Sequence, residues 1–241
     1  MRIIRTRNYK ELSTVAAEMI LAQVILKPDS VLGLATGGSP VGAYERIVEA
    51  YQRGKVDFSQ VTSINLDEYR GLPRNHEQSY RYFMEEHLFR YINIRSDHTF
   101  VPNGENPDID ETCAEYDRII AKAGGIDMQL LGIGLDGHIG FNEPGNYFEL
   151  NTHCVELTES TIDANRRFFN SREDVPRQAY TLGIKPIMQA KKVVMIAHGE
   201  NKAEIIRKAF TGPVTPQIPA SILQIHPDFT LIAEENALSQ L

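Results

Sequence analysis

The stretch VLGLATGGSP at positions 31–40 joins an apolar run to a glycine pair and then to Ser39 and Pro40. A short apolar run that is bounded by turn residues is typical of a buried strand. A serine followed by a proline is typical of the N-cap and first turn of a helix. The stretch therefore predicts a buried strand over 31–35 that leads through a tight turn into a helix.

Strand-like and helix-like segments alternate along the whole chain. Apolar runs predict strands at 2–5, 31–35, 61–66, 128–133, 179–184, 192–197 and 229–233. Apolar residues at helical spacing predict helices at 12–24, 39–51, 79–91, 109–123 and 201–210. Uninterrupted apolar strands separated by amphipathic helices indicate an α/β fold, in which helices cover both faces of a parallel sheet.

Composition and charge narrow the range of partners. The chain has 25 basic and 32 acidic residues and a net charge of -7, whereas a nucleic-acid-binding surface should show a basic excess. Cys113 and Cys154 are too few for a disulfide framework and lack a zinc-type spacing. Glu18 and Gln23 interrupt the apolar stretch 15–26, so it predicts no membrane span, and the first residues predict no signal peptide. We therefore expect a cytoplasmic protein that binds neither nucleic acid nor membranes.

The turn at 36–39 is a candidate phosphate-binding loop, because ligands of parallel α/β folds bind at the carboxyl ends of the strands. Gly37 and Gly38 let the backbone approach a ligand, the next helix offers free N–H groups, and Thr36 and Ser39 add hydroxyl groups. No Gly-Lys-Ser/Thr sequence follows, which excludes a Walker A loop. A plain strand-to-helix turn explains the same residues equally well.

Asp67 follows the predicted strand at 61–66 and is a candidate base. A carboxylate at the tip of a buried strand is partly desolvated, which raises its pKa toward the range useful for proton transfer. An aspartate that caps a turn is the competing interpretation. Glu68 should point to the opposite side of the strand, toward solvent or a structural partner.

The glycine-rich segment GIGLDGHIGFNEPG at 132–145 follows another predicted strand. It contains a GxGxxG pattern, but the glycines and proline that follow would break the helix that a dinucleotide site needs. Asp136, His138 and Glu143 remain as three ionisable groups on one loop. They predict a proton-transfer relay in which carboxylates orient the imidazole. A metal site is less favoured, because the loop has one histidine and no HxH or HExxH pattern.

Two cationic positions could hold an anionic ligand. Lys202 lies at the start of a predicted helix after the strand at 192–197, which is the same setting as the loop at 36–39. Arg167 belongs to the arginine-rich stretch 159–177. For each position taken alone, a solvated surface cation is the competing interpretation.

Five motifs together resemble the glucosamine/galactosamine-6-phosphate isomerase family, which is related to 6-phosphogluconolactonases. They are LATGGSP (34–40), NLDEYRGL (65–72), LGIGLDGHIGFNEPG (131–145), ANRRFF (164–169) and GENKAEIIRKAF (199–210). The resemblance implies one Rossmann-like domain over 1–241, a three-layer α/β/α sandwich with a mostly parallel sheet. It also implies a hydrolase or isomerase of amino-sugar catabolism that converts D-glucosamine 6-phosphate and water to D-fructose 6-phosphate and ammonia.

The resemblance further implies a role for each candidate residue. Asp67 matches the base that moves the C2 proton. His138 matches the group that opens the sugar ring, with Asp136 and Glu143 as its carboxylate partners. The positions that match substrate-binding residues are Thr36, Gly37, Gly38, Ser39, Gly137, Arg167 and Lys202. The stretch around 157–180 corresponds to a mobile lid over the sugar, and neither a metal nor an organic cofactor is expected.

Three other functions were weighed against this one. A 6-phosphogluconolactonase needs no C2 base, so Asp67 and Glu143 count against it, and a sugar-phosphate sensor would need a DNA-binding segment. A galactosamine-6-phosphate deaminase remains the alternative. Hexameric relatives carry basic residues at an effector site where 151–156 reads NTHCVE here, and the chain ends soon after residue 233. We therefore expect a non-allosteric enzyme that is a monomer or a small homo-oligomer.

Overall fold

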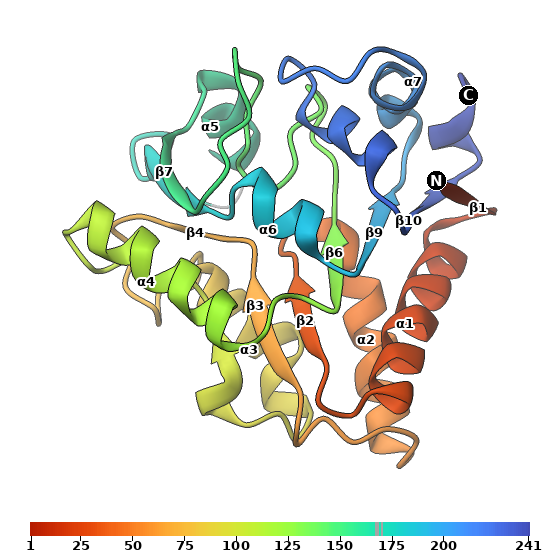
Figure 1. The fold of residues 1–241 in the computed structure, drawn as a ribbon, viewed down its shortest axis with the longest axis vertical. Coiled ribbons are helices and arrows are strands. Elements are labelled where there is room, and N and C mark those ends of the chain that lie inside the picture. Colours follow the sequence, from red (N-terminus) through yellow and green to blue (C-terminus); the bar gives the residue numbers. More distant parts are fainter. Residues whose placement is uncertain (167–168, 170) are drawn as a thin grey trace.

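The computed structural model describes residues 1–166, 169 and 171–241 (Figure 1). Its strands are β1 (Arg2–Thr6), β2 (Val31–Leu34), β3 (Thr62–Asn65), β4 (Asp67–Tyr69), β5 (Thr99–Phe100), β6 (Met128–Leu131), β7 (His153–Glu156), β8 (Gln178–Thr181), β9 (Lys192–Ala197) and β10 (Phe229–Glu234). Its α helices are α1 (Tyr9–Leu26), α2 (Gly38–Gln52), α3 (Tyr80–His87), α4 (Ile109–Lys122), α5 (Glu159–Asn165), α6 (Ile184–Gln189) and α7 (Ala203–Thr211). Short 3₁₀ turns include η4 (Glu200–Lys202) and η5 (Pro219–Ile225).

The strands form two sheets of different kinds. The larger has seven strands in the order β1-β10-β9-β6-β2-β3-β5, and every neighbouring pair in it is parallel. The smaller has three antiparallel strands in the order β4-β8-β7. The chain passes from the larger to the smaller sheet at Leu66, whose N–H donates to Leu34 and whose carbonyl oxygen accepts from Leu182. Asp67 is therefore held at the junction between the two sheets.

Helices cover both faces of the larger sheet (Figure 1). One apolar core joins the sheet to α1, α2 and α3, with Leu12, Ile20 and Tyr44 among its fully buried side chains. The opposite core joins the sheet to α4, α6 and α7, and it includes Tyr116 and Phe210. Each buried aliphatic or aromatic side chain contributes about 1.5–3 kcal/mol, so both cores hold the strands firmly in place. The predicted Rossmann-like α/β/α sandwich with a mostly parallel sheet is confirmed.

The order of the strands reverses between β2 and β6. From β2 the chain continues to β3 and β5 on one side, and it then returns to β6 on the other side of β2. Such a switch point opens a crevice at the carboxyl ends of the strands, where α/β proteins bind ligands. The candidate phosphate loop follows β2 and the glycine-rich loop follows β6, so the topology brings the two predicted segments to one crevice.

Two local predictions were wrong, and one strand was not predicted. Ser39 is not the N-cap of α2: Gly37 takes that place with φ 91°, a conformation that glycine adopts without strain, so the helix begins earlier. The segment 179–184 is not one strand of the parallel sheet, because β8 belongs to the antiparallel sheet and α6 begins at Ile184. The strand β7 was not predicted, since it is short, mixes polar and apolar residues, and has none that is fully buried.

Candidate active site

The candidate phosphate loop joins β2 to α2 and faces open space. Gly37 and Gly38 are exposed, and a Cβ at either position would meet no atom within 4 Å. Thr36 and Ser39 flank them and are half-buried. No side chain caps the first turn of α2, so its N–H groups can bind an anion. Tyr9 braces the loop, because its hydroxyl lies 3.0 Å from the carbonyl oxygen of Gly38 and 3.1 Å from that of Ser39.

Asp67 is buried at the junction of the two sheets, with 6% of the residue exposed. Burial, and after it the charge of Glu68, raises the pKa of Asp67 to about 8. Gly140 of the glycine-rich loop approaches so closely that a Cβ there would lie 3.5 Å from Asp67 Oδ2 and 2.8 Å from Thr181 Oγ1. The structure thus brings the candidate base and the glycine-rich loop together.

Glu68 has a structural environment, not a solvent-facing one. It is 3% exposed, and its carboxylate accepts the backbone N–H groups of Tyr69 at 2.8 Å, Tyr80 at 2.8 Å and Arg81 at 2.9 Å. Burial raises the pKa of Glu68 to about 7, although these hydrogen bonds lower it. Glu68 therefore ties β4 to the first turn of α3. Of the two environments expected for it, solvent or a structural partner, the structure shows the structural partner.

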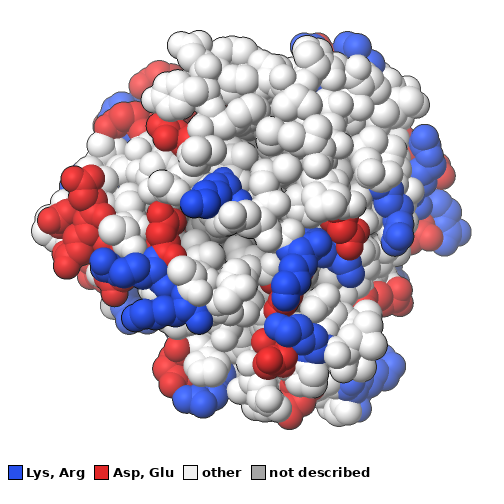
Figure 2. Space-filling model, viewed as in Figure 1, with Lys and Arg blue, Asp and Glu red and all other residues white. Residues whose placement is uncertain are grey.

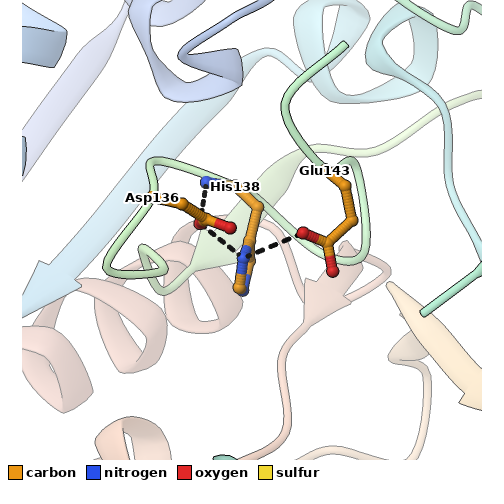
Figure 3. A group of neighbouring side chains, drawn as sticks. All are labelled: Asp136, His138 and Glu143. Atoms are coloured by element: carbon orange, nitrogen blue, oxygen red, sulfur yellow. Dashed lines mark hydrogen bonds and ion pairs between the residues drawn. The ribbon is translucent and has the colours of Figure 1, made fainter. Parts of the chain in front are cut away.

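The three ionisable groups of the glycine-rich loop meet around the imidazole of His138 (Figure 3). Its Nδ1 lies 2.8 Å from Asp136 Oδ1 and 3.9 Å from Glu143 Oε2, so the two carboxylates flank the same ring nitrogen. Asp136 Oδ1 also accepts the backbone N–H of His138 at 3.1 Å. Carboxylates at one ring nitrogen set the tautomer and the orientation of the imidazole.

The two carboxylates differ in their environments. The side chain of Asp136 is 35% exposed and that of Glu143 only 8%. Burial raises the pKa of Asp136, but the hydrogen bonds and charge of His138 outweigh it and hold that pKa well below its usual value. Burial raises the pKa of Glu143 above its usual value, against a hydrogen bond from Thr161. Titratable groups whose pKa values are pushed apart are typical of acid–base sites.

Two glycines shape the loop around the imidazole. A Cβ at Gly134 would lie 2.3 Å from the ring of His138, so the ring occupies the space that a side chain would fill. Gly137 has φ 91°, and a Cβ there would lie 2.6 Å from Ile218. The N–H of Gly137 donates to Gly134, and its carbonyl oxygen accepts from Ala220. The predicted contact of Gly137 with substrate stays a prediction.

Lys202 lies at the same edge of the sheet as the glycine-rich loop. Its Nζ donates to the carbonyl oxygen of Ile133 at 2.6 Å, just beyond β6. Burial lowers the pKa of Lys202, and the nearby charge of Asp136 partly offsets this. A half-buried ammonium group in this place differs from the solvated surface cation of the competing interpretation. Arg167, the other predicted phosphate-binding cation, lies outside the described residues.

Two hydroxyl groups that the sequence did not single out contact the glycine-rich loop. Thr161 of α5 donates to Glu143 Oε1 at 2.6 Å, across 18 positions of the chain. Thr181 of β8 accepts the N–H of Phe141 at 3.0 Å, across 40 positions. No local spacing marks either threonine, because both contacts depend on how the smaller sheet and α5 pack against the loop.

The same three ionisable residues could also hold a metal ion. One ligand atom from each of Asp136, His138 and Glu143 lies within 4.8 Å of the others. One imidazole with two carboxylates is a poorer zinc set than the histidine- and cysteine-rich sets of most zinc sites. One oxygen of Glu143 is also already bonded to Thr161. The arrangement therefore fits a proton relay better than a metal centre.

Fold and site together define an α/β protein that has an acid–base group and a candidate phosphate-binding loop where the strand order reverses. The family model described as glucosamine-6-phosphate isomerases/6-phosphogluconolactonase matches residues 8–231, and the chain belongs to this family. Of the two enzyme classes expected from the sequence, isomerase agrees with the description of the amino-sugar members, whereas hydrolase does not.

Relatives named glucosamine-6-phosphate deaminase match the chain over nearly its full length. One from Lachnoclostridium phytofermentans is 58% identical over 232 residues, which cover 96% of this chain and 98% of the relative. One from Clostridium perfringens is 53% identical over 241 residues and 100% of both chains. The solved structure of a monomeric glucosamine-6-phosphate deaminase has a TM-score of 0.97 at 40% identity and 100% coverage of both chains. A 6-phosphogluconolactonase from Trypanosoma cruzi shares the fold, with a TM-score of 0.80, 17% identity and coverage of 100% and 96%.

Proposed function

We propose that this chain is a deaminase that converts D-glucosamine 6-phosphate and water to D-fructose 6-phosphate and ammonia. Two relatives that carry this name are 58% and 53% identical over almost the whole chain. The observation that carries the proposal is the meeting of a buried carboxylate, Asp67, with the loop that holds His138 between two carboxylates. The reaction needs one base for the C2 proton and a separate acid–base group for ring opening.

Binding of the phosphate group fixes the sugar in the crevice. The loop at 36–39 offers N–H and hydroxyl groups, Lys202 offers a half-buried charge, and Arg167 completes the proposed set. A phosphate held in this way places C1 and C2 at defined positions, and its binding energy helps to drive ring opening and orientation.

His138 is the proposed group for ring opening. Asp136 and Glu143 face Nδ1, which leaves Nε2 to exchange a proton with the substrate. In this step the imidazole takes the proton of the C1 hydroxyl and returns it to the ring oxygen, so the pyranose becomes an open-chain aldehyde. Throughout this step Asp136 and Glu143 hold the ring in the orientation that presents Nε2 to the substrate.

Asp67 is the proposed base of the isomerisation. Its carboxylate takes the C2 proton of the open chain while the substrate's ammonium group gives a proton to the C1 oxygen, and Asp67 then returns the C2 proton to C1. The nitrogen at C2 is left as an iminium group, which water hydrolyses to the ketone and ammonia. The buried position of Asp67 raises its pKa to about 8, which favours both acceptance and return of a proton near neutral pH.

A coupled assay for ammonia and fructose 6-phosphate tests this function. We expect equal amounts of both products from glucosamine 6-phosphate, with or without a chelator. Release of a ketose phosphate mainly from galactosamine 6-phosphate would support the alternative substrate instead. Hydrolysis of 6-phosphogluconolactone without ammonia release from either amino sugar would contradict the proposal, and loss of activity with the chelator would indicate a metal among Asp136, His138 and Glu143.

Replacement of Lys202 by alanine should mainly raise KM. Loss of one charge-assisted bond to the phosphate weakens binding by about 1.5–3 kcal/mol. Lys208→Ala is the matched control, because Lys208 lies on α7 with an exposed side chain that pairs with Glu204. An unchanged KM in Lys202→Ala would remove this lysine from the phosphate site.

The enzyme should show no activation by N-acetylglucosamine 6-phosphate. A cavity of about 360 Å³ is lined by residues of 141–149 and 153–156, and its lining residues among those described include no lysine or arginine. Glu143, Glu149 and Glu156 line it instead, which disfavours a phosphate group. Saturation curves for substrate should therefore be hyperbolic and unaffected by the effector. A sigmoidal curve that the effector makes hyperbolic would contradict this.

We also propose a cytoplasmic location and a monomer or small homo-oligomer, a state that light scattering of the pure protein would measure. The structural relative with a TM-score of 0.97 is described as monomeric. Within the described part of the chain, no helix is long and apolar enough to cross a membrane. On the face shown in Figure 2, basic and acidic side chains are mixed, which agrees with a small-molecule substrate better than with nucleic acid.

A further inference from the structure

The hydrogen bond between Thr161 and Glu143 connects the glycine-rich loop to the segment 157–180, the proposed lid. Thr161 is 8% exposed, and its hydroxyl donates to Glu143 Oε1 at 2.6 Å. A hydrogen bond from a hydroxyl to a carboxylate at this distance is charge-assisted and roughly twice as strong as a neutral one. The contact is thus a strong link between the proposed lid and the catalytic loop.

This bond uses only one of the two oxygens of Glu143. The other, Oε2, has no hydrogen-bond partner among the described residues and lies 3.9 Å from Nδ1 of His138. Only 8% of the Glu143 side chain is exposed, so solvent contributes little to its orientation. A carboxylate that is anchored through one oxygen has the direction of the other one fixed, and here that direction is toward the imidazole.

Apolar packing brings the hydroxyl to its place. Ile162, the neighbour of Thr161, is buried in one cluster with Phe141 of the glycine-rich loop and Tyr69 of β4. Phe141 lies close to Glu143 in the chain. The hydrogen bond therefore forms when α5 is packed on this cluster, and it is lost if α5 moves away.

We propose that Thr161 is a positioning residue, through which the segment 157–180 directs Glu143 toward His138 for ring opening. This inference rests on the proposed deaminase function and adds to it a link between the packing of the proposed lid and the acid–base group. Ring opening then becomes efficient only when α5 is packed against the glycine-rich loop, because only then is Glu143 held by the hydroxyl.

The hydroxyl should also influence the charge of Glu143. The titratable groups around it, from its own loop and from the cavity that it lines, are Asp136, His138, Glu149, His153 and Glu156. Burial raises the pKa of Glu143, while the Thr161 hydrogen bond and the charge of His138 lower it. Removal of the hydroxyl should raise this pKa further, so that the ionised carboxylate is populated only at higher pH.

The test compares Thr161→Val, which removes the hydroxyl at nearly constant volume, with Thr161→Ser, which keeps it. Ser171→Ala is the control within the same segment, because it deletes a hydroxyl that bonds to Asp174 at 3.0 Å. Rates of ammonia release are measured for the wild type and each variant against pH, with the cyclic substrate and with an open-chain analogue. Thermal unfolding checks that each variant folds, and Thr161→Ala replaces the valine variant if that one does not.

We expect kcat of Thr161→Val to fall about 10- to 100-fold for the cyclic substrate, with a KM within about threefold of wild type. The acid limb of its kcat profile should move to higher pH, and the open-chain analogue should be slowed much less. Thr161→Ser should restore most of the rate, and Ser171→Ala should retain it. An unchanged kcat in Thr161→Val, an equally slow Thr161→Ser or an equal loss in Ser171→Ala would overturn the inference. A wild type that releases no ammonia would instead refute the proposed function.

Discussion

Replacement of Asp67 by asparagine should abolish turnover and leave substrate affinity within about tenfold of wild type. The amide has nearly the shape of the carboxylate but cannot accept the C2 proton. In the proposed site the phosphate is bound by other residues, the loop at 36–39 and Lys202, so the substrate should still bind. The rate of ammonia release should fall by about 1000-fold or more, because a positioned general base contributes about 100- to 10000-fold.

The measurement pairs turnover with calorimetric binding of the substrate to the inactive variant. Asp29→Asn is the control, since Asp29 precedes β2 at the opposite edge of the sheet and its side chain is 70% exposed. That variant should turn over at the wild-type rate. A near-wild-type rate in Asp67→Asn would remove Asp67 as the base, and a complete loss of binding would point to a structural role.

The stability of Asp67→Asn relative to the wild type should increase as the pH rises. The sign of this effect follows from the pKa of Asp67. In the folded chain this pKa is about 8, whereas an aspartate in an unfolded chain has a pKa of about 3.9. Because the pKa of Asp67 is higher in the folded chain, its contribution to the free energy of unfolding is fully present below the pKa of the unfolded chain. This contribution is lost as the pH rises to the pKa of the folded chain, because at pH values between the two pKa values unfolding releases a proton. The asparagine variant lacks this titration, so its Tm relative to wild type should rise between about pH 4 and 8 and then level off. A constant difference in Tm across this range would show that Asp67 is not desolvated.

The positions of the candidate groups were predictable from sequence wherever a strand ends in chemically distinctive residues. Gly37, Asp67 and His138 all follow short apolar runs, and parallel topology brings the ends of such runs to one edge. These features depend on a few consecutive residues or on a topological rule.

The features that were missed depend on contacts between distant segments. Glu68 was expected to face either solvent or a structural partner, and only the packing of α3 against β4, which brings the N–H groups of Tyr80 and Arg81 to its carboxylate, decides between the two. Thr161 is one of several polar residues in its segment, and its importance appears only where α5 meets Glu143. The N-cap of α2 was misplaced by two positions, at Ser39 instead of Gly37, because a glycine with positive φ can start a helix without help from a serine. These features depend on burial and on contacts between distant segments, and the spacing of residues in the sequence reveals neither.

Replacement of His138 by glutamine should separate ring opening from isomerisation. Glutamine still offers hydrogen-bonding groups between Asp136 and Glu143, but it cannot take up and return a proton near neutral pH. The cyclic substrate should therefore be slowed by about 100-fold or more. An open-chain analogue needs no ring opening and relies on Asp67, so its rate should change far less.

Comparing the two substrates in one variant separates a defect in ring opening from a general disturbance of the loop. A general disturbance of the loop would slow both substrates alike, because Gly140 of the same loop lies against Asp67. His87→Gln supplies the matched control, since the ring of His87 contacts Phe83 on α3, 4.3 Å between centroids, and it should leave both rates unchanged. Equal slowing of the two substrates by His138→Gln would refute the ring-opening role. Selective slowing of the cyclic form would assign ring opening to the imidazole of His138. It would leave transfer of the C2 proton to Asp67, in agreement with the different environments of the two groups.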